Sequence, residues 1–312
     1  MDVSVIIVNW NTSELLLGCL RSIFDQKLAI TFEVIVIDNA SSDDSIVKVK
    51  SMYPKVTIIE NNENKGFAAA NNQGMKIAKG RYILCLNPDT IVLDRAMQSV
   101  VEYADVHTEA AVIGCQVLLN SVEIQKTCFT YPSIKFLIIG MFKLNKIFPQ
   151  SRFFGGEYYE WWDRRTPKQV DVVSGMFMLV RKAAIDQVGM MDESYFIYAE
   201  ETDWCYRFNK AGWKCLFTPD AQIIHLHGGS NSTSQVSVKM YVQMQKSILI
   251  FIRKHFGGLS WLLSKIVLIL FMIIRTLISA MVAAIQHDSD SRQKLLQSLA
   301  ALRFHVIGAQ PK

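Results

Sequence analysis

The sequence of 312 residues lacks the signatures of several common protein classes. It has no G-x-G-x-x-G motif, which argues against a Rossmann-type dinucleotide site, and no G-x-x-x-x-G-K-[ST] motif, which excludes a P-loop. Its six cysteines include no C-x-x-C pair, so neither a zinc site nor a disulfide framework is indicated. We interpret the cysteines as buried, reduced thiols of a cytosolic protein.

Acidic residues are almost missing from the last third of the chain. Residues 221–312 contain ten Lys/Arg but only Asp288 and Asp290, a net charge of +8, whereas residues 1–220 have a net charge of −3. This profile argues against a nucleic-acid-binding protein and indicates a soluble domain held against an anionic membrane. No basic leader precedes the apolar run Val3–Val8, so we expect the chain to lie on the cytoplasmic face of the membrane.

The C-terminal segment also lacks an apolar run long enough to span a bilayer. Helical patterns cover residues 236–255 and 260–286, with Gly257-Gly258 between them, and the longest wholly apolar run, Ile266–Ile274, has nine residues. A free-standing spanning helix needs about twenty. The polar side chains of the second helix share one arc around Lys265: Ser264, Arg275, Thr276, Ser279, Gln286 and His287. An amphipathic, membrane-surface helix is favoured over a single span or a helix packed on a partner subunit.

The first hundred residues alternate between strand and helix patterns. Four apolar strand patterns and three helical ones predict an α/β fold, with a mostly parallel central sheet covered by helices on both faces. The strands are expected at 3–8, 33–38, 56–60 and 81–86, and the helices at 14–26, from 43 onward and at 67–78. Further strands are expected at 111–119, 170–181, 213–217 and 221–225. The aromatic-rich segment 129–162 is interpreted as a loop, either a mobile lid or packed on the body.

Polar residues follow three of the predicted strands, at Asn9–Thr12, Asp38–Asp43 and Asn87–Thr90. Each cluster alone is typical of turns and helix caps. Because ligands of open parallel sheets bind beyond the carboxyl ends of the strands, the three together predict a binding cleft. Asp38 is suited to accept the N–H of a pyrimidine ring, and Lys65 with the amides before the 67–78 helix is suited to a phosphate. Asp89 beside Asn87 is a hard oxygen donor for Mg²⁺ or Mn²⁺.

Two further groups of residues bear chemistry. Five carboxylates lie within residues 192–203, and crowded carboxylates raise one another's pKa values, which suits a general base. Asp203 and Arg207 have the i, i+4 spacing of a structural ion pair. His225 and His227 are two residues apart on a predicted strand, so their side chains face the same side. They are candidates either for a metal site or for a structural role.

The ordered set of these motifs resembles glycosyltransferase family 2, with the GT-A fold, in its bacterial rhamnosyltransferase-like branch. The matching segments are Val3–Thr12, Val36–Ser45, Asn64–Asn72, Leu86–Thr90, Ser174-Gly175, Glu200–Arg207 and His225–Gly228. The resemblance covers roughly residues 1–230 and implies a GT-A domain there. Residues 1–105 would form its nucleotide-sugar-binding half and 106–230 its acceptor and catalytic half. Residues 231–312 remain as a basic, helical, membrane-associating region, with membrane contact expected at 236–287.

The resemblance also implies roles for individual residues. The donor site would comprise Val8, Asn9, Asn11, Asp38, Asn39, Lys65, Gly66, Asn71, Asn87 and Asp89. Asp89 and His227 would bind the metal, with Asn87 at a position where the family has an acid. Glu201 would be the general base, with Glu200 and Asp203 as alternatives, and Trp204 and Arg207 would contact the acceptor.

The function implied is inverting transfer of a sugar from a nucleotide diphosphate donor to a saccharide acceptor, expected to be lipid-linked, in cell-surface polysaccharide synthesis. L-rhamnose from dTDP-rhamnose is the donor sugar that the resemblance favours. Two other classes stay open: a metal-dependent sugar-phosphate nucleotidyltransferase, and a non-catalytic nucleotide-sugar-binding scaffold at the membrane. A Gly-rich basic loop after the first strand, typical of the former, is missing at Asn9–Thr12. Whether the chain forms a homo-oligomer is also left open.

Overall fold

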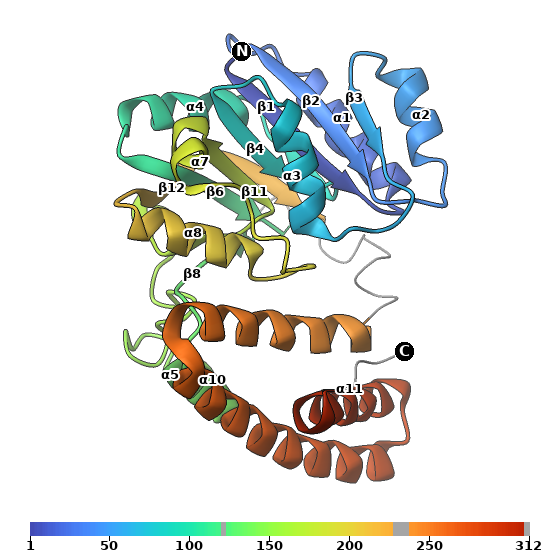
Figure 1. Cartoon of the computed structure of the whole chain (residues 1–312), viewed down its shortest axis with the longest axis vertical. Coiled ribbons are helices and arrows are strands. Elements are labelled where there is room, and N and C mark those ends of the chain that lie inside the picture. Colours follow the sequence, from blue (N-terminus) through green and yellow to red (C-terminus); the bar gives the residue numbers. More distant parts are fainter. Residues whose placement is uncertain (120–122, 227–236, 309–312) are drawn as a thin grey trace.

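A computed structural model describes residues 1–119, 123–226 and 237–308 (Figure 1). The strands are β1 (Val3–Asn9), β2 (Phe32–Asp38), β3 (Thr57–Glu60), β4 (Tyr82–Leu86), β5 (Thr90–Val92), β6 (Ala110–Leu118), β7 (Ile124–Gln125), β8 (Cys128–Phe129), β9 (Lys168–Val170), β10 (Val172–Val173), β11 (Phe177–Arg181) and β12 (Lys214–His225). The helices are α1 (Ser13–Phe24), α2 (Ser45–Met52), α3 (Phe67–Ile77), α4 (Ala96–Val106), α5 (Ile134–Met141), α6 (Leu144–Ile147), α7 (Lys182–Val188), α8 (Glu200–Lys210), α10 (Ser237–Gln286) and α11 (Ser289–Ile307).

One large sheet carries the fold, in the order β3-β2-β1-β4-β11-β6-β12-β5. Its first four strands are parallel, as expected, whereas β11 runs antiparallel to both β4 and β6. Side chains of β1 alternate between two cores. Val3, Val5 and Ile7 pack with α1, α2 and α4 on one face, and Ile6 packs with α3, α7 and α8 on the other. The α/β architecture with helices on both faces is therefore confirmed.

Three expected elements differ from the structure. The strand predicted at 170–181 is broken, because Val172-Val173 leave the large sheet to pair with β8. The two strands predicted at 213–217 and 221–225 are a single strand, β12, whose register shifts around Pro219. Proline lacks the N–H of a regular ladder, and the shift lets β12 pair with β9 before it and β5 after it. The segment 129–162, expected to be a loop, contains α5 and α6.

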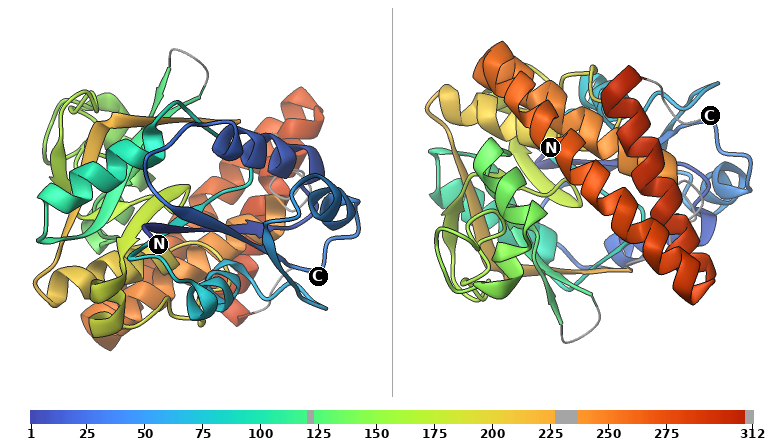
Figure 2. Two further views of the ribbon diagram at one scale, coloured as in Figure 1. Left: turned by 90° about the horizontal axis from the view of Figure 1, so that it is seen from above. Right: turned by 90° about the horizontal axis from the view of Figure 1, so that it is seen from below.

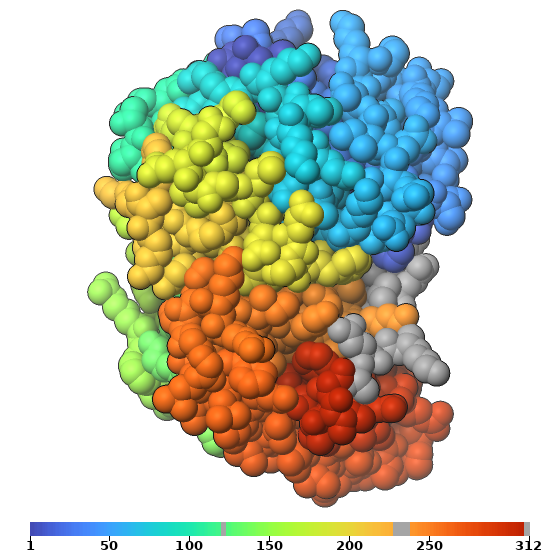
Figure 3. Space-filling view, viewed as in Figure 1, coloured from blue at the N-terminus to red at the C-terminus, as the bar shows by residue number. Residues whose placement is uncertain are grey.

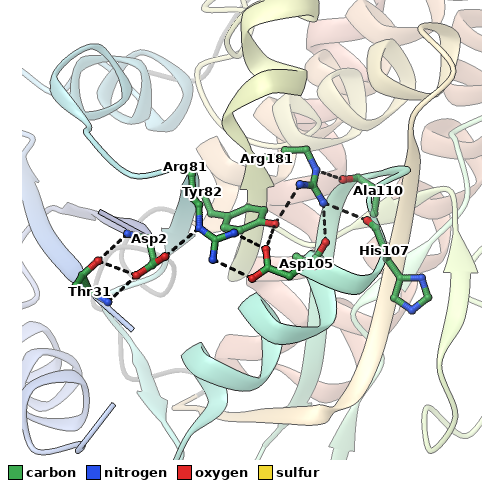
Figure 4. A network of polar contacts seen from close by, with 9 residues as sticks. Asp2, Thr31, Arg81, Tyr82, Asp105, His107, Ala110 and Arg181 are labelled. Atoms are coloured by element: carbon green, nitrogen blue, oxygen red, sulfur yellow. Dashed lines mark hydrogen bonds and ion pairs between the residues drawn. The ribbon is translucent and has the colours of Figure 1, made fainter. Parts of the chain in front are cut away.

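An arginine network closes the sheet at the end where β1 begins (Figure 4). Arg81 donates to Asp2 and Asp105, and the Tyr82 hydroxyl also donates to Asp105. Hydrogen bonds from Arg81 hold the pKa of Asp105 below its usual value. Arg181 donates to the carbonyl oxygens of Ala104 (2.7 Å), Ala110 (2.9 Å) and His107 (3.1 Å) (Figure 4). One guanidinium thus ties the end of α4 to the start of β6.

Replacing Arg181 with Met is expected to lower the free energy of unfolding by about 2–4 kcal/mol, because three partly buried carbonyl groups lose their donor. Urea unfolding followed by circular dichroism measures this change. The exposed Arg165, changed to Met in the same way, is the matched control and should shift the free energy by less than about 0.5 kcal/mol. Equal effects of the two substitutions would contradict a specific role for Arg181.

The first half of α10 is part of the globular body rather than of a separate tail. Phe251 and Ile252 are fully buried against Tyr195 and Ala199. The Ser247 hydroxyl donates to the Ile197 carbonyl oxygen at 2.9 Å. In the space-filling view this half of α10 lies directly against the segment that precedes and includes α8 (Figure 3). Residues 237–256 therefore pack on the body of the protein, although the sequence analysis expected the GT-A domain to end at residue 230.

A sharp bend at Gly257, where φ is +83°, separates this half from the second half of α10. The left-handed conformation there favours glycine, in agreement with the break expected at Gly257-Gly258. The second half then folds back beneath the first and packs on α11, a helix that the sequence analysis did not predict (Figures 1 and 2).

The second half of α10 has its polar side inward. Ser264 is fully buried, and Lys265, Arg275 and Thr276 are partly buried. Arg275 donates to the Tyr241 hydroxyl of the first half. The opposite side exposes large apolar side chains: Leu259, Leu262, Leu263, Ile266, Leu270, Ile273, Ile274, Leu277, Ile278, Met281 and Ile285. By length and composition Val238–Gln286 is apolar enough to cross a membrane. A helix on the surface of a water-soluble protein buries its apolar side and exposes its polar side, whereas the second half of α10 does the reverse.

Candidate active site

A cavity of about 370 Å³ lies at the carboxyl ends of β1, β2 and β4. Val8, Trp10 and Thr12 line it from the end of β1, and Asn87 and Asp89 line it from the end of β4. Met240 of α10, Asn39 after β2 and the segment Phe196–Tyr198 complete much of the wall. The structure thus brings together the three polar clusters that follow the strands, at the sheet edge where the sequence predicts a cleft.

Asp38 is fixed at the base of this edge. Asn9 Nδ2 donates to Asp38 Oδ1 at 2.8 Å, the Ser41 amide donates to Oδ2 at 2.9 Å, and the Ser41 hydroxyl donates to Oδ1 at 2.6 Å. Thr12 in turn donates to Asn9 Oδ1. These hydrogen bonds fix the orientation of the Asp38 carboxylate and leave it able to accept a further hydrogen bond. Asn11, in a left-handed conformation, accepts a hydrogen bond from the Ser42 amide and so ties the two loops together.

The turn before α3 approaches the opposite wall closely. Gly66 has φ of +84°, and a Cβ there would lie 2.3 Å from the Phe196 carbonyl oxygen. The Phe67 amide donates to that same oxygen at 2.7 Å. Asn39 Nδ2 donates to the Gly66 carbonyl oxygen. Lys65 is exposed beside this turn. Only glycine fits here. Asn64 and Gly66 line the cleft, but the Gly66 and Phe67 amides already donate to Asn64 Oδ1 and to the Phe196 carbonyl oxygen, so the contact of Lys65 with a phosphate stays a prediction.

Asn71 is one turn into α3 and fully buried. Its Nδ2 donates to the Phe67 carbonyl oxygen, while its Oδ1 has no hydrogen-bond partner in the described part of the chain. A buried amide oxygen without a donor is costly unless a ligand or water supplies one. Asn71 therefore remains a candidate for the donor site, although it does not line the cavity itself.

Asp89 has the character of a metal ligand. It is 7% exposed, and its Oδ1 is buried without a hydrogen-bond partner among the described residues. His225 Nε2 lies 3.2 Å from Asp89 Oδ2. The described residues hold no cluster of three or more His, Cys, Asp or Glu suited to a metal. One carboxylate, that of Asp89, is enough for Mg²⁺ or Mn²⁺ when a diphosphate and water supply the other ligands. His227, the other expected ligand, lies outside the described residues.

Glu200 and Glu201 begin α8 immediately after Tyr198 and Ala199, which both have positive φ. Two successive non-glycine residues in this conformation are strained, and such strain is concentrated at functional sites. Glu200 Oε2 and Glu201 Oε2 are both buried without a hydrogen-bond partner in the described chain. Burial and the neighbouring Glu201 raise the pKa of Glu200 well above its usual value, and burial raises the pKa of Glu201 to about 7. The pair therefore holds a proton near neutral pH.

Two of the remaining three expected residues, Asp203 and Trp204, are fully buried, and Arg207 is partly buried. Trp204 is fully buried, and its Nε1 donates to the Gly189 carbonyl oxygen at 2.8 Å. Arg207 donates to Asp203 Oδ2 at 2.7 Å and to the Val188 and Met190 carbonyl oxygens. Asp203 is fully buried. None of the three lines the cavity, and neither do Glu200 and Glu201, so contact of any of these residues with the acceptor stays a prediction. The burial and hydrogen bonds of Trp204, Asp203 and Arg207 support a packing and positioning role.

Asp203 joins α8 to α10. Besides Arg207 it contacts Lys254 Nζ and His255 Nε2, each at 2.7 Å from Oδ1. Lys254 also pairs with Asp192 at 2.6 Å. Burial alone would raise the pKa of Asp192, but hydrogen bonds from Lys254 and Ser194 outweigh it and lower the pKa to about 2. The first half of α10 thereby fixes both ends of the segment that carries Glu200 and Glu201.

Sequence reasoning missed Phe196, Tyr198, Met240 and His255. Met240 and His255 lie in what the sequence presented as a membrane tail, so no motif marked them. The aromatic run before Glu200 was noted, but its place in the cleft wall depends on the turn at Gly66.

A model of the family described as glycosyl transferase family 2 matches residues 4–189. The chain belongs to this family. It is 26% identical over 239 residues to the N-acetylglucosaminyl-diphospho-decaprenol L-rhamnosyltransferase of Mycobacterium tuberculosis, covering 72% of this chain and 76% of that protein. It is 22% identical over 254 residues to the low-salt glycan biosynthesis hexosyltransferase Agl10 of Haloferax volcanii, covering 80% and 75%.

Among solved structures, the chain is similar to the mannosyltransferase PcManGT of Pyrobaculum calidifontis, in complex with GDP-Man and Mn²⁺. The TM-score is 0.59 at 13% identity, and the match covers 99% of this chain and 88% of that one. The fold is thus the GT-A fold that the sequence resemblance implied, and the protein is a glycosyltransferase.

Proposed function

We propose that this glycosyltransferase moves a sugar, L-rhamnose from dTDP-rhamnose, onto a lipid-linked saccharide at the cytoplasmic face of the membrane, with inversion at the anomeric carbon. The observation that carries the proposal is the cleft itself, which is lined by Asp89 with its unpartnered oxygen. Asp38 is fixed immediately before Asn39 of the lining, and the two buried glutamates follow shortly after Tyr198 of the lining. The rhamnosyltransferase among its relatives supports the choice of sugar and of acceptor class.

In the proposed donor complex, Asp38 accepts the N–H of the pyrimidine ring. The turn at Gly66 and the exposed Lys65 face the diphosphate. Asp89, with Asn87 beside it, would hold Mg²⁺ or Mn²⁺, and when bound the metal would offset the negative charge of the departing diphosphate. The Mn²⁺ bound to the mannosyltransferase neighbour supports this requirement.

Glu201 is proposed as the general base, because it is the more accessible of the two glutamates. Glu200 is more deeply buried and keeps the shared proton. The Glu201 carboxylate takes the proton of the acceptor hydroxyl as its oxygen bonds to the anomeric carbon. The bond from that carbon to the diphosphate oxygen breaks in the same step, and the nucleoside diphosphate leaves with the electron pair. One displacement inverts the carbon.

The inverted pattern of α10 supports the membrane location. Its exposed apolar side would lie in the bilayer surface, while Lys265 and Arg275 face the protein. The sharp turn at Gly257, which folds the second half back under the first, supports an interfacial helix over a span.

Thermal stabilisation by dTDP, UDP, GDP and ADP, each with and without Mn²⁺, tests the donor assignment. We expect selective, metal-dependent stabilisation by dTDP, growing with ligand concentration as linkage requires. Asp89→Asn should remove the Mn²⁺ dependence without lowering the melting temperature of the free protein. An equal response of the variant and the parent to Mn²⁺ would show that Asp89 is not the ligand. Stabilisation by a purine diphosphate alone would exclude the dTDP donor.

A further inference from the structure

The segment 124–156 combines exposed apolar side chains with a one-sided charge. It contains five Lys/Arg and no Asp or Glu. Four large apolar side chains are at least half exposed: Phe142 (59%), Ile147 (61%), Phe148 (50%) and Phe153 (57%). Such a group of aromatic and aliphatic residues on a water-exposed surface marks an interaction site.

This segment is held rigidly beside α10. Leu137 of α5 and Tyr131 before it pack on Phe251 and Ile252 of α10. The Tyr131 and Phe251 rings are stacked with centroids 6.2 Å apart. Figures 1 and 2 place α5 at the same end of the molecule as the second half of α10 and α11. The segment that contains α5 therefore lies beside α10, at the end of the molecule where the second half of α10 exposes its apolar side chains.

The basic residues surround these apolar side chains. Lys143, Lys146 and Arg152 are exposed and form no ion pair within the described residues. Lys135 Nζ lies over the Phe136 and Phe153 rings, 4.2 and 4.9 Å from their centroids. Cations next to exposed aromatic rings match the boundary between lipid headgroups and acyl chains.

We propose that residues 138–153 are a second membrane contact, which binds the surface of an anionic bilayer together with α10. The aromatic and aliphatic side chains would enter the headgroup boundary, and Lys143, Lys146 and Arg152 would face lipid phosphates. A second copy of the chain fits this surface less well, because a two-fold contact would place these cations against one another. The inference rests on the membrane location proposed above but not on the sugar, the donor or the reaction.

Site-specific fluorescence gives the first test. All six native cysteines are buried, so a single introduced cysteine can be labelled selectively in the full chain. Phe148→Cys carries an environment-sensitive nitrobenzoxadiazole probe. Leu270→Cys on α10 is the positive control, and Val106→Cys on α4, 79% exposed and at the other end of the molecule, is the negative control. Vesicles contain phosphatidylcholine alone or mixed with phosphatidylglycerol.

We expect a blue shift and quenching by spin-labelled lipid at residues 148 and 270, but not at 106, with phosphatidylglycerol strengthening the response. A response at residue 270 alone would overturn the second contact while leaving the membrane location of α10 intact. No response at either position would overturn both. If dTDP still stabilised the protein in that case, the donor assignment would stand independently.

Flotation with the same vesicles separates the charge from the apolar contribution. Phe142→Ser with Phe148→Ser, and separately Lys143→Glu with Lys146→Glu, should each lower partitioning onto anionic vesicles by about tenfold or more. The charge pair should matter little on neutral vesicles. Unchanged partitioning of both variants, or a wild-type dimer in light scattering that both variants make monomeric, would overturn the proposal. Nucleotide stabilisation confirms that each variant is folded.

Discussion

Glu201→Gln is expected to reduce turnover by about 10²- to 10⁴-fold while leaving nucleotide binding intact. Glutamine preserves the shape of the side chain but cannot take the acceptor proton. A radiolabelled sugar-transfer assay measures turnover, and thermal stabilisation by dTDP with Mn²⁺ measures binding. Substantial residual turnover would remove Glu201 from the role of base.

Glu200→Gln is the matched control for this experiment. Because Glu200 is proposed to remain protonated, glutamine mimics its working state and turnover should fall far less. If turnover fell more in Glu200→Gln than in Glu201→Gln, Glu200 would be the base and Glu201 the residue that stays protonated.

Glu201→Gln also has a predictable effect on the free energy of unfolding. The folded-state pKa of Glu201 is raised to about 7 by burial, so the folded protein binds the proton more tightly than the unfolded chain does. The stability of the parent therefore falls as the pH rises from the ordinary glutamate range to about 7. Glu201→Gln should be more stable than the parent at pH 8, and the difference should vanish in acid. Activity of the parent should rise over the same interval, as the base becomes ionised.

Truncation at two neighbouring points is expected to have opposite results. A chain ending at Gly258 keeps the first half of α10 and loses the apolar second half with α11, so it should fold and bind dTDP without detergent. A chain ending at Val236 loses Phe251 and Ile252 from a buried cluster, together with Lys254 and His255, which both contact Asp203. This loss exceeds about 5 kcal/mol and removes most of the stability of an ordinary domain.

Circular dichroism and dTDP stabilisation of the two truncated proteins measure this difference. A folded, nucleotide-binding chain ending at Val236 would show that α10 contributes nothing to the body, and the boundary at residue 230 expected from the sequence would then hold.

The N-terminal half of the fold was predictable because its strands are uninterrupted apolar runs with polar residues at their ends. The cleft followed from that periodicity, since Asn9 and Asp38 end the parallel strands β1 and β2, and Asp89 lies in the turn after β4. The bend and apolar pattern of α10 were also visible, but a hydrophobic helix gives no sign of which side it buries. The Asp203–Arg207 pair was predictable from its i, i+4 spacing. The packing of Phe251 against Tyr195 and the contacts of Asp203 with Lys254 and His255 join residues more than forty positions apart in the sequence.

The same limit applies to the acceptor residues. The family resemblance assigned Glu201 and Trp204 to one site, and their i, i+3 spacing places them on the same side of α8. That spacing does not show which of the two side chains is buried. The structure places Trp204 in the core with its ring nitrogen bonded to Gly189.

The bend at Gly257 has a consequence for the choice of acceptor. Met240, before the bend, lines the cleft, and the residues after it form the surface proposed to lie on the bilayer. In the proposed membrane-bound state, the two halves of α10 would set the height of the cleft above the lipid. The enzyme would then select the hydroxyl that stands at this height from the lipid anchor, so acceptors already extended by another sugar should be poor substrates even when their terminal residue is the correct one.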